Sequence, residues 1–192
     1  MDYVSLAVRT ENKDYEGVKA RIDGRTIRFL HGAMGLATEV AELQESGDAT
    51  NLKEELGDLM WYSALICHEA PFDLENIELT ARFVIGKFSP HHDVPRQLFL
   101  MFERDLVRSS GRLVDALKKS VFYGRHLDMV KMKEDLTIVI CNIIKSCNAF
   151  GIDYEDMKAK NIDKLRARYP DKFTESDALE RDLDNEKKAL GG

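Results

Sequence analysis

Residues 36–66 contain two helical segments joined by a linker too short to let them separate. The linker, SGDATN, is rich in residues that interrupt helices, and a connection of this length joins antiparallel neighbours. Leucine and valine recur at helical spacing on both sides of it, so each segment has an apolar stripe that must be covered. The stretch therefore predicts a helical hairpin around which the rest of the chain folds.

The same hairpin carries two pairs of acidic residues, Glu39 with Glu42 and Glu55 with Asp58. The members of each pair are an i, i+3 pair, so their side chains lie on one face of a helix. At about 100° per residue, the two pairs take equivalent positions beside the apolar stripes of their helices. We therefore expect the four carboxylates to converge, whereas Glu54 is expected to point to solvent.

No segment alternates apolar and polar residues as strands do, so we predict an all-α helical bundle. A short helix is expected near 3–9, followed by irregular or weakly helical chain over 10–24. From the apolar periodicity and the Asp, Gly and Pro residues at segment ends, longer helices are expected at about 25–45, 50–69, 74–87, 96–121, 129–149 and 154–168.

An internal repeat relates the two halves of the chain. Residues 52–77 align without a gap with residues 132–157, and VAELQES (40–46) aligns with VDALKKS (114–120) across a longer turn. We interpret this as a duplicated helical hairpin, although two amphipathic helices can also match by coincidence. The repeat lacks the acidic cluster, because the counterparts of the four acids are Leu113, Ala116, Asp135 and Ile138.

The repeat suggests how the chain is organised. We expect one all-α domain over 1–192, built from two related hairpins. Residues 25–87 would be the acidic, catalytic half and 96–173 the degenerate half. The charged tail, 174–192, has few apolar positions and is expected to be a surface helix or a frayed end.

Composition narrows the classes of function. The net charge of −6, without a sustained basic stripe, argues against nonspecific nucleic-acid binding. No apolar run reaches transmembrane length, and the first residues lack the pattern of a signal peptide, so no membrane association is expected. Three cysteines in apolar helical segments are typical of buried, reduced thiols, which favours a cytoplasmic protein.

Four converging carboxylates repel one another unless a cation neutralises them. Oxygen ligands select Mg²⁺, with Mn²⁺ as a substitute, rather than zinc, copper or iron. A di-iron site is disfavoured because neither acidic pair is followed by the histidine of a Glu-x-x-His motif. Mg²⁺ with phosphate oxygens in its coordination sphere indicates hydrolysis of a phosphoanhydride.

The acidic pairs within GLATEVAELQE and NLKEELGDLMWY resemble those of the MazG-like all-α nucleoside triphosphate pyrophosphohydrolases, which are related to dimeric dUTPases and phosphoribosyl-ATP pyrophosphohydrolases. The segment NIDKLRARYPDKF (161–173) is similar to the terminal N-x-x-K-L-x-x-R-Y-P segment of such proteins. The resemblance covers most of residues 25–87 and 128–173. It implies Mg²⁺-dependent cleavage of a (d)NTP between the α and β phosphates, giving (d)NMP and pyrophosphate.

By motif position, the resemblance implies four metal ligands: Glu39, Glu42, Glu55 and Asp58. It also implies that Glu39 or Glu42 positions the attacking water. In this chain a whole repeat separates the acidic pairs from the N-x-x-K-L segment, so the second half is a candidate for base recognition.

Four further residues are candidates for substrate binding. Trp61 is expected either to stack on a base or to belong to the core. Tyr62 is expected near the acidic residues, where it could also stack on a base or pack in the core. Lys164 and Arg168 bind phosphates or are ordinary cations at a helix C-terminus. His31 is expected to pack rather than to ligate, and His91 and His92 to lie in a surface loop.

These observations predict a nucleotide pyrophosphohydrolase that acts on nucleoside triphosphates as a homodimer. Two alternatives stay open: an enzyme specific for dUTP, and a non-catalytic bundle that binds a nucleotide or a partner.

Overall fold

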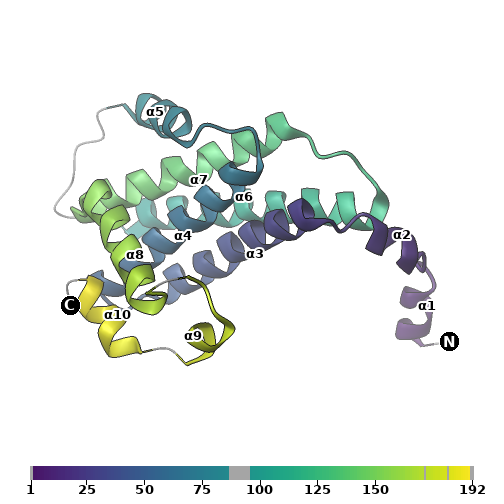
Figure 1. Ribbon diagram of the computed structural model, residues 1–192. Helices are drawn as coiled ribbons and strands as arrows, with labels where there is room; N and C mark the ends of the chain where they lie inside the picture. The colour runs from purple at the N-terminus through teal and green to yellow at the C-terminus, as the bar shows by residue number, and fades with distance from the viewer. Residues whose placement is uncertain (1, 87–95, 171, 181, 191–192) are drawn as a thin grey trace.

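The structure, a computed structural model, describes residues 2–86, 96–170, 172–180 and 182–190 (Figure 1). These residues form helices and contain no strand, which confirms the prediction of an all-α bundle. The helices of the described residues are α1 (Tyr3–Val8), α2 (Tyr15–Ala20), α3 (Gly24–Glu45), α4 (Ala49–Glu69), α5 (Leu74–Ile85), α6 (Arg96–Tyr123), α7 (Met129–Phe150), α8 (Tyr154–Arg168), α9 (Glu175–Leu179) and α10 (Leu183–Leu190).

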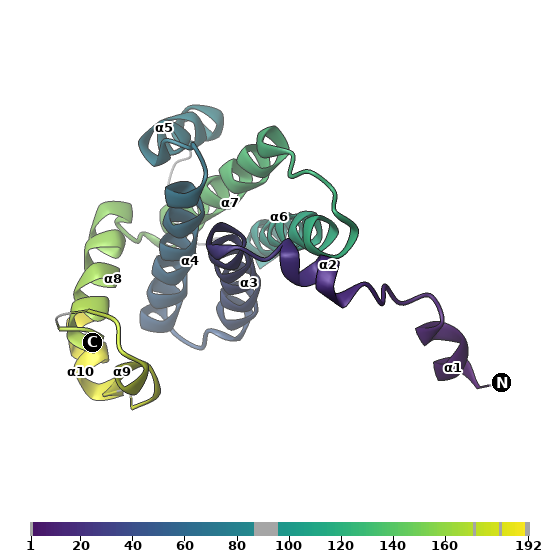
Figure 2. The same ribbon diagram turned by 45° about the vertical axis from the view of Figure 1, so that its right-hand side comes forward.

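Four long helices, α3, α4, α6 and α7, form the centre of the molecule (Figure 2). Helix α3 packs on α4 and on α6, while α7 packs on α6 and α4. Their apolar stripes meet in one continuous core, whose fully buried members include Leu36, Leu56, Leu59, Leu106, Leu113, Leu136 and Ile140. The three cysteines are also buried and free.

Aspartates begin corresponding helices of the two halves. Asp48 caps α4 and Asp128 caps α7, while Asp73 caps α5 and Asp153 caps α8. Each side chain accepts a hydrogen bond from a backbone N–H in the first turn, a contact that stabilises a helix by about 1 kcal/mol. The alignment of 52–77 with 132–157 pairs Asp73 with Asp153, and the same 80-residue offset relates Asp48 to Asp128 just before it.

The third helix of each half packs against the other half. Helix α5 packs on α7, and α8 packs on α4. This exchange brings α8, from the second copy of the repeat, beside the acidic residues of the first copy. The boundaries proposed for the two halves stay a prediction, because the core runs through both without interruption.

The ends of the chain differ in how they are attached. Helix α1 lies away from the bundle beyond α2, whereas α10 packs against α8 at the opposite end of the molecule (Figures 1 and 2). Leu190 and Glu186 are buried, so the α10 part of the charged tail is a packed surface helix rather than a frayed end. His91 and His92 lie outside the described residues.

Among the described helices, none is by itself long and apolar enough to cross a membrane. Helices α7 and α8 pass that test only as a pair, and they are bent by 106° where they meet.

Candidate metal and nucleotide site

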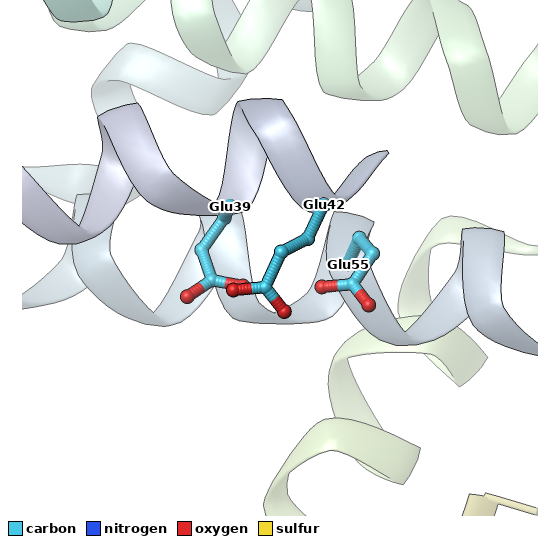
Figure 3. A group of neighbouring side chains, drawn as sticks. All are labelled: Glu39, Glu42 and Glu55. Carbon is cyan, nitrogen blue, oxygen red and sulfur yellow. The ribbon is translucent and has the colours of Figure 1, made fainter. Parts of the chain in front are cut away.

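Three of the four predicted acids come together between α3 and α4. Glu39 and Glu42 extend from α3, and the carboxylate of Glu55 faces them from α4 (Figure 3). One carboxylate oxygen of each residue lies within 4.8 Å of the others. Glu39 and Glu55 are buried, whereas Glu42 is exposed. The group therefore has an inner side made by two buried acids and an outer side that faces solvent.

Small residues on α3 allow the two helices to approach this closely. A Cβ atom at Gly32 would lie 2.6 Å from Cγ1 of Ile66, and one at Gly35 would lie 2.1 Å from the ring of Tyr62. Both distances are shorter than side-chain contacts in proteins, so any larger residue would force Ile66 or Tyr62 to move from the space that glycine leaves. This explains why α3 contains glycines that cost a helix about 1 kcal/mol each.

Burial changes the acidity of the two inner carboxyls. Loss of solvent raises the pKa of Glu39 to about 8, and the charges of Asp58 and Glu42 act in the same direction. Burial likewise raises the pKa of Glu55 to about 7, although a hydrogen bond from Glu39 opposes this rise. A cation placed among the three carboxylates would stabilise their ionised forms and so lower both pKa values.

Asp58 lines the same pocket but lies outside the group of three. It is one turn further along α4 and therefore faces α8. Its carboxylate accepts a hydrogen bond of 2.6 Å from Nδ2 of Asn161 and forms an ion pair with Nζ of Lys164. The prediction that Asp58 ligates a metal stays a prediction, because in the structure both of its oxygens contact α8.

Glu54 corrects one expectation from the sequence. It was expected to point to solvent, yet its carboxylate pairs with Lys164 at 3.2 Å and borders the pocket. Helical periodicity placed it opposite the α3 contact, but α8 covers that side of α4. Lys164 is fully buried between the two carboxylates, so its ammonium group is already neutralised.

Gly57 makes room for the contact between α4 and α8. A Cβ atom at this position would lie 2.9 Å from Cβ of Asn161. The buried Asn161 side chain thus passes over the backbone of α4 to reach Asp58. We refer to Asp58, Asn161 and Lys164 as the α4–α8 clamp.

An aromatic cluster forms another side of the pocket. The rings of Trp61 and Tyr62 make an edge contact with centroids 4.8 Å apart, and His31 contacts both rings edge-on. His31 was expected to pack, and it does so at the rim of the pocket. The pocket has a volume of about 340 Å³, which lies in the ~300–1,000 Å³ range of small-molecule sites. We call it the acidic pocket.

Arg168 also lines the acidic pocket, but its guanidinium group is held by the tail. Nε and Nη2 of Arg168 donate to the two carboxylate oxygens of the buried Glu186, at 3.0 and 2.5 Å. This two-point contact raises the pKa of Arg168 further above its ordinary value. Both cations predicted to bind phosphate, Lys164 and Arg168, are therefore paired with carboxylates of the chain.

Sequence reasoning missed three contributors to this site. Asn161 could have been recognised from the sequence, since it is the first residue of the N-x-x-K-L segment. Glu186 could not, because one glutamate in a charged tail looks like any other. Phe173, an exposed residue after α8, also lines the pocket. Its ring contacts that of Tyr169, with the two ring centroids 5.4 Å apart.

The donor set fits a divalent cation. Within the described residues, no lysine or arginine forms an ion pair with Glu39, Glu42 or Glu55, although all three lie close together. Carboxylate oxygens at this spacing suit a hard cation such as Mg²⁺.

Comparison with known proteins agrees with this arrangement. Residues 30–87 match the family model of the MazG nucleotide pyrophosphohydrolase domain. The match confirms the resemblance to the MazG-like superfamily over most of α3, all of α4 and α5, and it includes the four acids, Trp61 and Tyr62. It does not extend to α8. A search of curated proteins and a search of solved structures gave no significant match.

Proposed function

We propose that this chain is a Mg²⁺-dependent enzyme that cleaves nucleoside triphosphates between the α and β phosphates, and the match of residues 30–87 to the MazG nucleotide pyrophosphohydrolase domain supports the proposal. The observation that carries the proposal is the convergence of Glu39, Glu42 and Glu55 within 4.8 Å, with no cation of the described chain paired to them. The second hairpin packs without such a group, so packing of two helices of this kind does not require it.

In this proposal, Glu39, Glu42 and Glu55 hold the ion, with Asp58 as a fourth ligand once it is released from α8. The bound ion would neutralise phosphate oxygens and lower the pKa of the attacking water. The chain's own residues supply orientation and proton transfer. Water attacks the α-phosphorus, its proton passes to Glu39 or Glu42, and the bond to the bridging oxygen breaks with its electron pair leaving on pyrophosphate.

The remaining walls of the acidic pocket suit the rest of a nucleotide. Trp61 and Tyr62 offer ring surfaces against which a base can stack, a contact worth about 1–3 kcal/mol. Arg168 also lines the pocket, where it would contact phosphate oxygens if Glu186 released it. The product would be a (d)NMP and pyrophosphate from a (d)NTP.

The test is pyrophosphate release from a panel of NTPs and dNTPs, including dUTP, by the full chain with Mg²⁺, with Mn²⁺ and in metal-depleted buffer. Wild type is expected to release pyrophosphate only with a divalent ion. Glu39→Gln should reduce the rate at least ~100-fold, as loss of a general base or ligand does. Glu45→Gln, an exposed residue at the end of the same helix, is the matched control and should leave the rate unchanged.

Two results would overturn the proposal. If Glu39→Gln releases pyrophosphate as fast as wild type, the acidic group is not catalytic. If wild type releases none from any nucleotide, the chain is a binding protein rather than an enzyme. Release from dUTP alone would instead narrow the activity to a dUTPase.

A further inference from the structure

A second cavity, of about 540 Å³, lies between α6, the α6–α7 connection and the start of α7. Figure 1 shows this connection at the opposite end of the bundle from α8 and α10. Leu113, Ala116 and Asp135 line the cavity. These are the residues that the internal repeat pairs with Glu39, Glu42 and Glu55. The cavity is therefore the counterpart of the acidic pocket in the second hairpin.

Two of the three carboxylates that line this second cavity, Asp115 and Asp135, form ion pairs with basic residues of the chain, and the third, Asp128, caps α7 by accepting a hydrogen bond from the backbone N–H of Lys131. Asp135 is buried, and Nε of Arg112 donates to its carboxylate at 2.6 Å. Asp115 forms ion pairs with Lys118 and Lys119, which lower its pKa to about 2. A divalent cation is thus not required here, in contrast to the acidic pocket.

Three further basic residues line the same cavity. Arg125 and His126 come from the α6–α7 connection, which is longer than its counterpart in the first hairpin, and Lys131 comes from the first turn of α7. In the part of the chain that the structure describes, none of the three side chains forms an ion pair. The positive end of the α7 dipole lies at the same place.

We propose that the second cavity binds a phosphate-bearing anion directly, without a divalent metal ion, and does not hydrolyse it. Arginine and lysine form strong, charge-assisted hydrogen bonds with phosphate oxygens. Leu113 and Ala116 stand where the acidic pocket has its proposed catalytic carboxylates, so this cavity has no base to activate water at these positions. Leu127 and Met132 add an apolar wall that a nucleoside could contact.

The experiment is isothermal titration of the full chain in metal-depleted, low-salt buffer with two probes, inorganic pyrophosphate and a nucleoside monophosphate. Wild type should bind at least one probe saturably. The double variant Arg125→Ala, Lys131→Ala should weaken that binding at least ~10-fold, since each removes a charge-assisted hydrogen bond. Arg104→Ala, Lys133→Ala removes the same charge from exposed positions on α6 and α7 that do not line the cavity, and should change the affinity less than ~2-fold.

A further variant distinguishes binding at the second cavity from binding at the acidic pocket. Glu39→Gln should bind the probe as wild type does, because the second cavity does not contain this residue. Tighter binding of the monophosphate would identify a nucleotide as ligand, and tighter binding of pyrophosphate an inorganic anion. The proposal is overturned by no saturable binding of either probe, by equal weakening in both double variants, or by loss of binding in Glu39→Gln.

Discussion

The ammonium group of Lys164, which is fully buried in α8, forms an ion pair with the carboxylate of Asp58 in α4. The two residues belong to different copies of the repeat. Because Asn161 donates to the same carboxylate, α8 is held against the acidic hairpin by two polar contacts rather than by apolar packing alone. The acidic pocket is thus completed by the half of the chain that lacks the acids.

Lys164→Met should destabilise the protein, because it leaves Asp58 and Glu54 side by side without a counter-charge. Removing one member of a buried ion pair costs about 3 kcal/mol. Urea unfolding followed by circular dichroism measures this change. Lys160→Met, on the same helix and without an ion pair among the described residues, should stay within about 0.5 kcal/mol of wild type. Equal stability of the two variants would show that the α4–α8 clamp contributes little.

Gly35→Ala should destabilise wild type by about 1–3 kcal/mol, because the new methyl group would overlap the ring of Tyr62. In a Tyr62→Ala background the same change should instead be neutral or stabilise by up to ~1 kcal/mol, since alanine favours the helix. Gly111→Ala, in α6 with open space around its Cβ position, should stabilise in either background. An unchanged sign for Gly35→Ala in the two backgrounds would contradict the close contact.

Without metal, the protein should lose stability as the pH rises from about 5 to about 8. The folded pKa values of Glu39 (about 8) and Glu55 (about 7) lie above the ordinary value of 4.5. In this window the folded state keeps a proton that the unfolded state releases, so a rise in pH favours unfolding. Urea unfolding of wild type and Glu39→Gln at several pH values measures the effect. The variant should show a shallower fall, and an identical slope would refute the assignment.

Trp61 provides a direct signal for nucleotide binding, because it is the single tryptophan of the chain and lines the acidic pocket. Addition of a nucleoside triphosphate with Ca²⁺, chosen to limit turnover, should change its fluorescence. Trp61→Ala should weaken binding about 10-fold, which corresponds to about 1.4 kcal/mol of lost stacking. Calorimetry measures the affinity of this variant, which has no tryptophan. If Trp61→Ala binds the nucleotide with wild-type affinity, Trp61 does not stack on the base and only packs against neighbouring residues.

Glu186→Ala should release α10 from α8, because it removes the carboxylate that holds the guanidinium of Arg168. Hydrogen exchange of residues 183–190 should become faster while that of α3 and α4 stays slow. Asp184→Ala, an exposed residue on the same helix, is the control and should leave exchange unchanged. Faster exchange throughout the bundle would show that α10 supports the whole core rather than one helix.

Several parts of the site followed from local sequence. The i, i+3 spacing of Glu39 with Glu42 placed both acids on one face of α3, and the short linker brought Glu55 opposite them. Aspartate caps marked the starts of α5, α7 and α8, and the start of α4 was predicted within one residue. These features depend on the geometry of one helix or one turn, so neighbouring residues suffice to predict them.

Local sequence therefore determined the acidic hairpin. Tertiary structure decided which residues pair with the side chains on the face of α4 that packs against α8. Periodicity put Glu54 in solvent, but packing of α8 against α4 turned it toward Lys164. The same packing engaged Asp58 with α8, and the docking of α10 engaged Arg168 with Glu186. These pairs join residues far apart along the chain. Which helix covers which face is settled by the burial of all apolar stripes together, and no single segment contains that information.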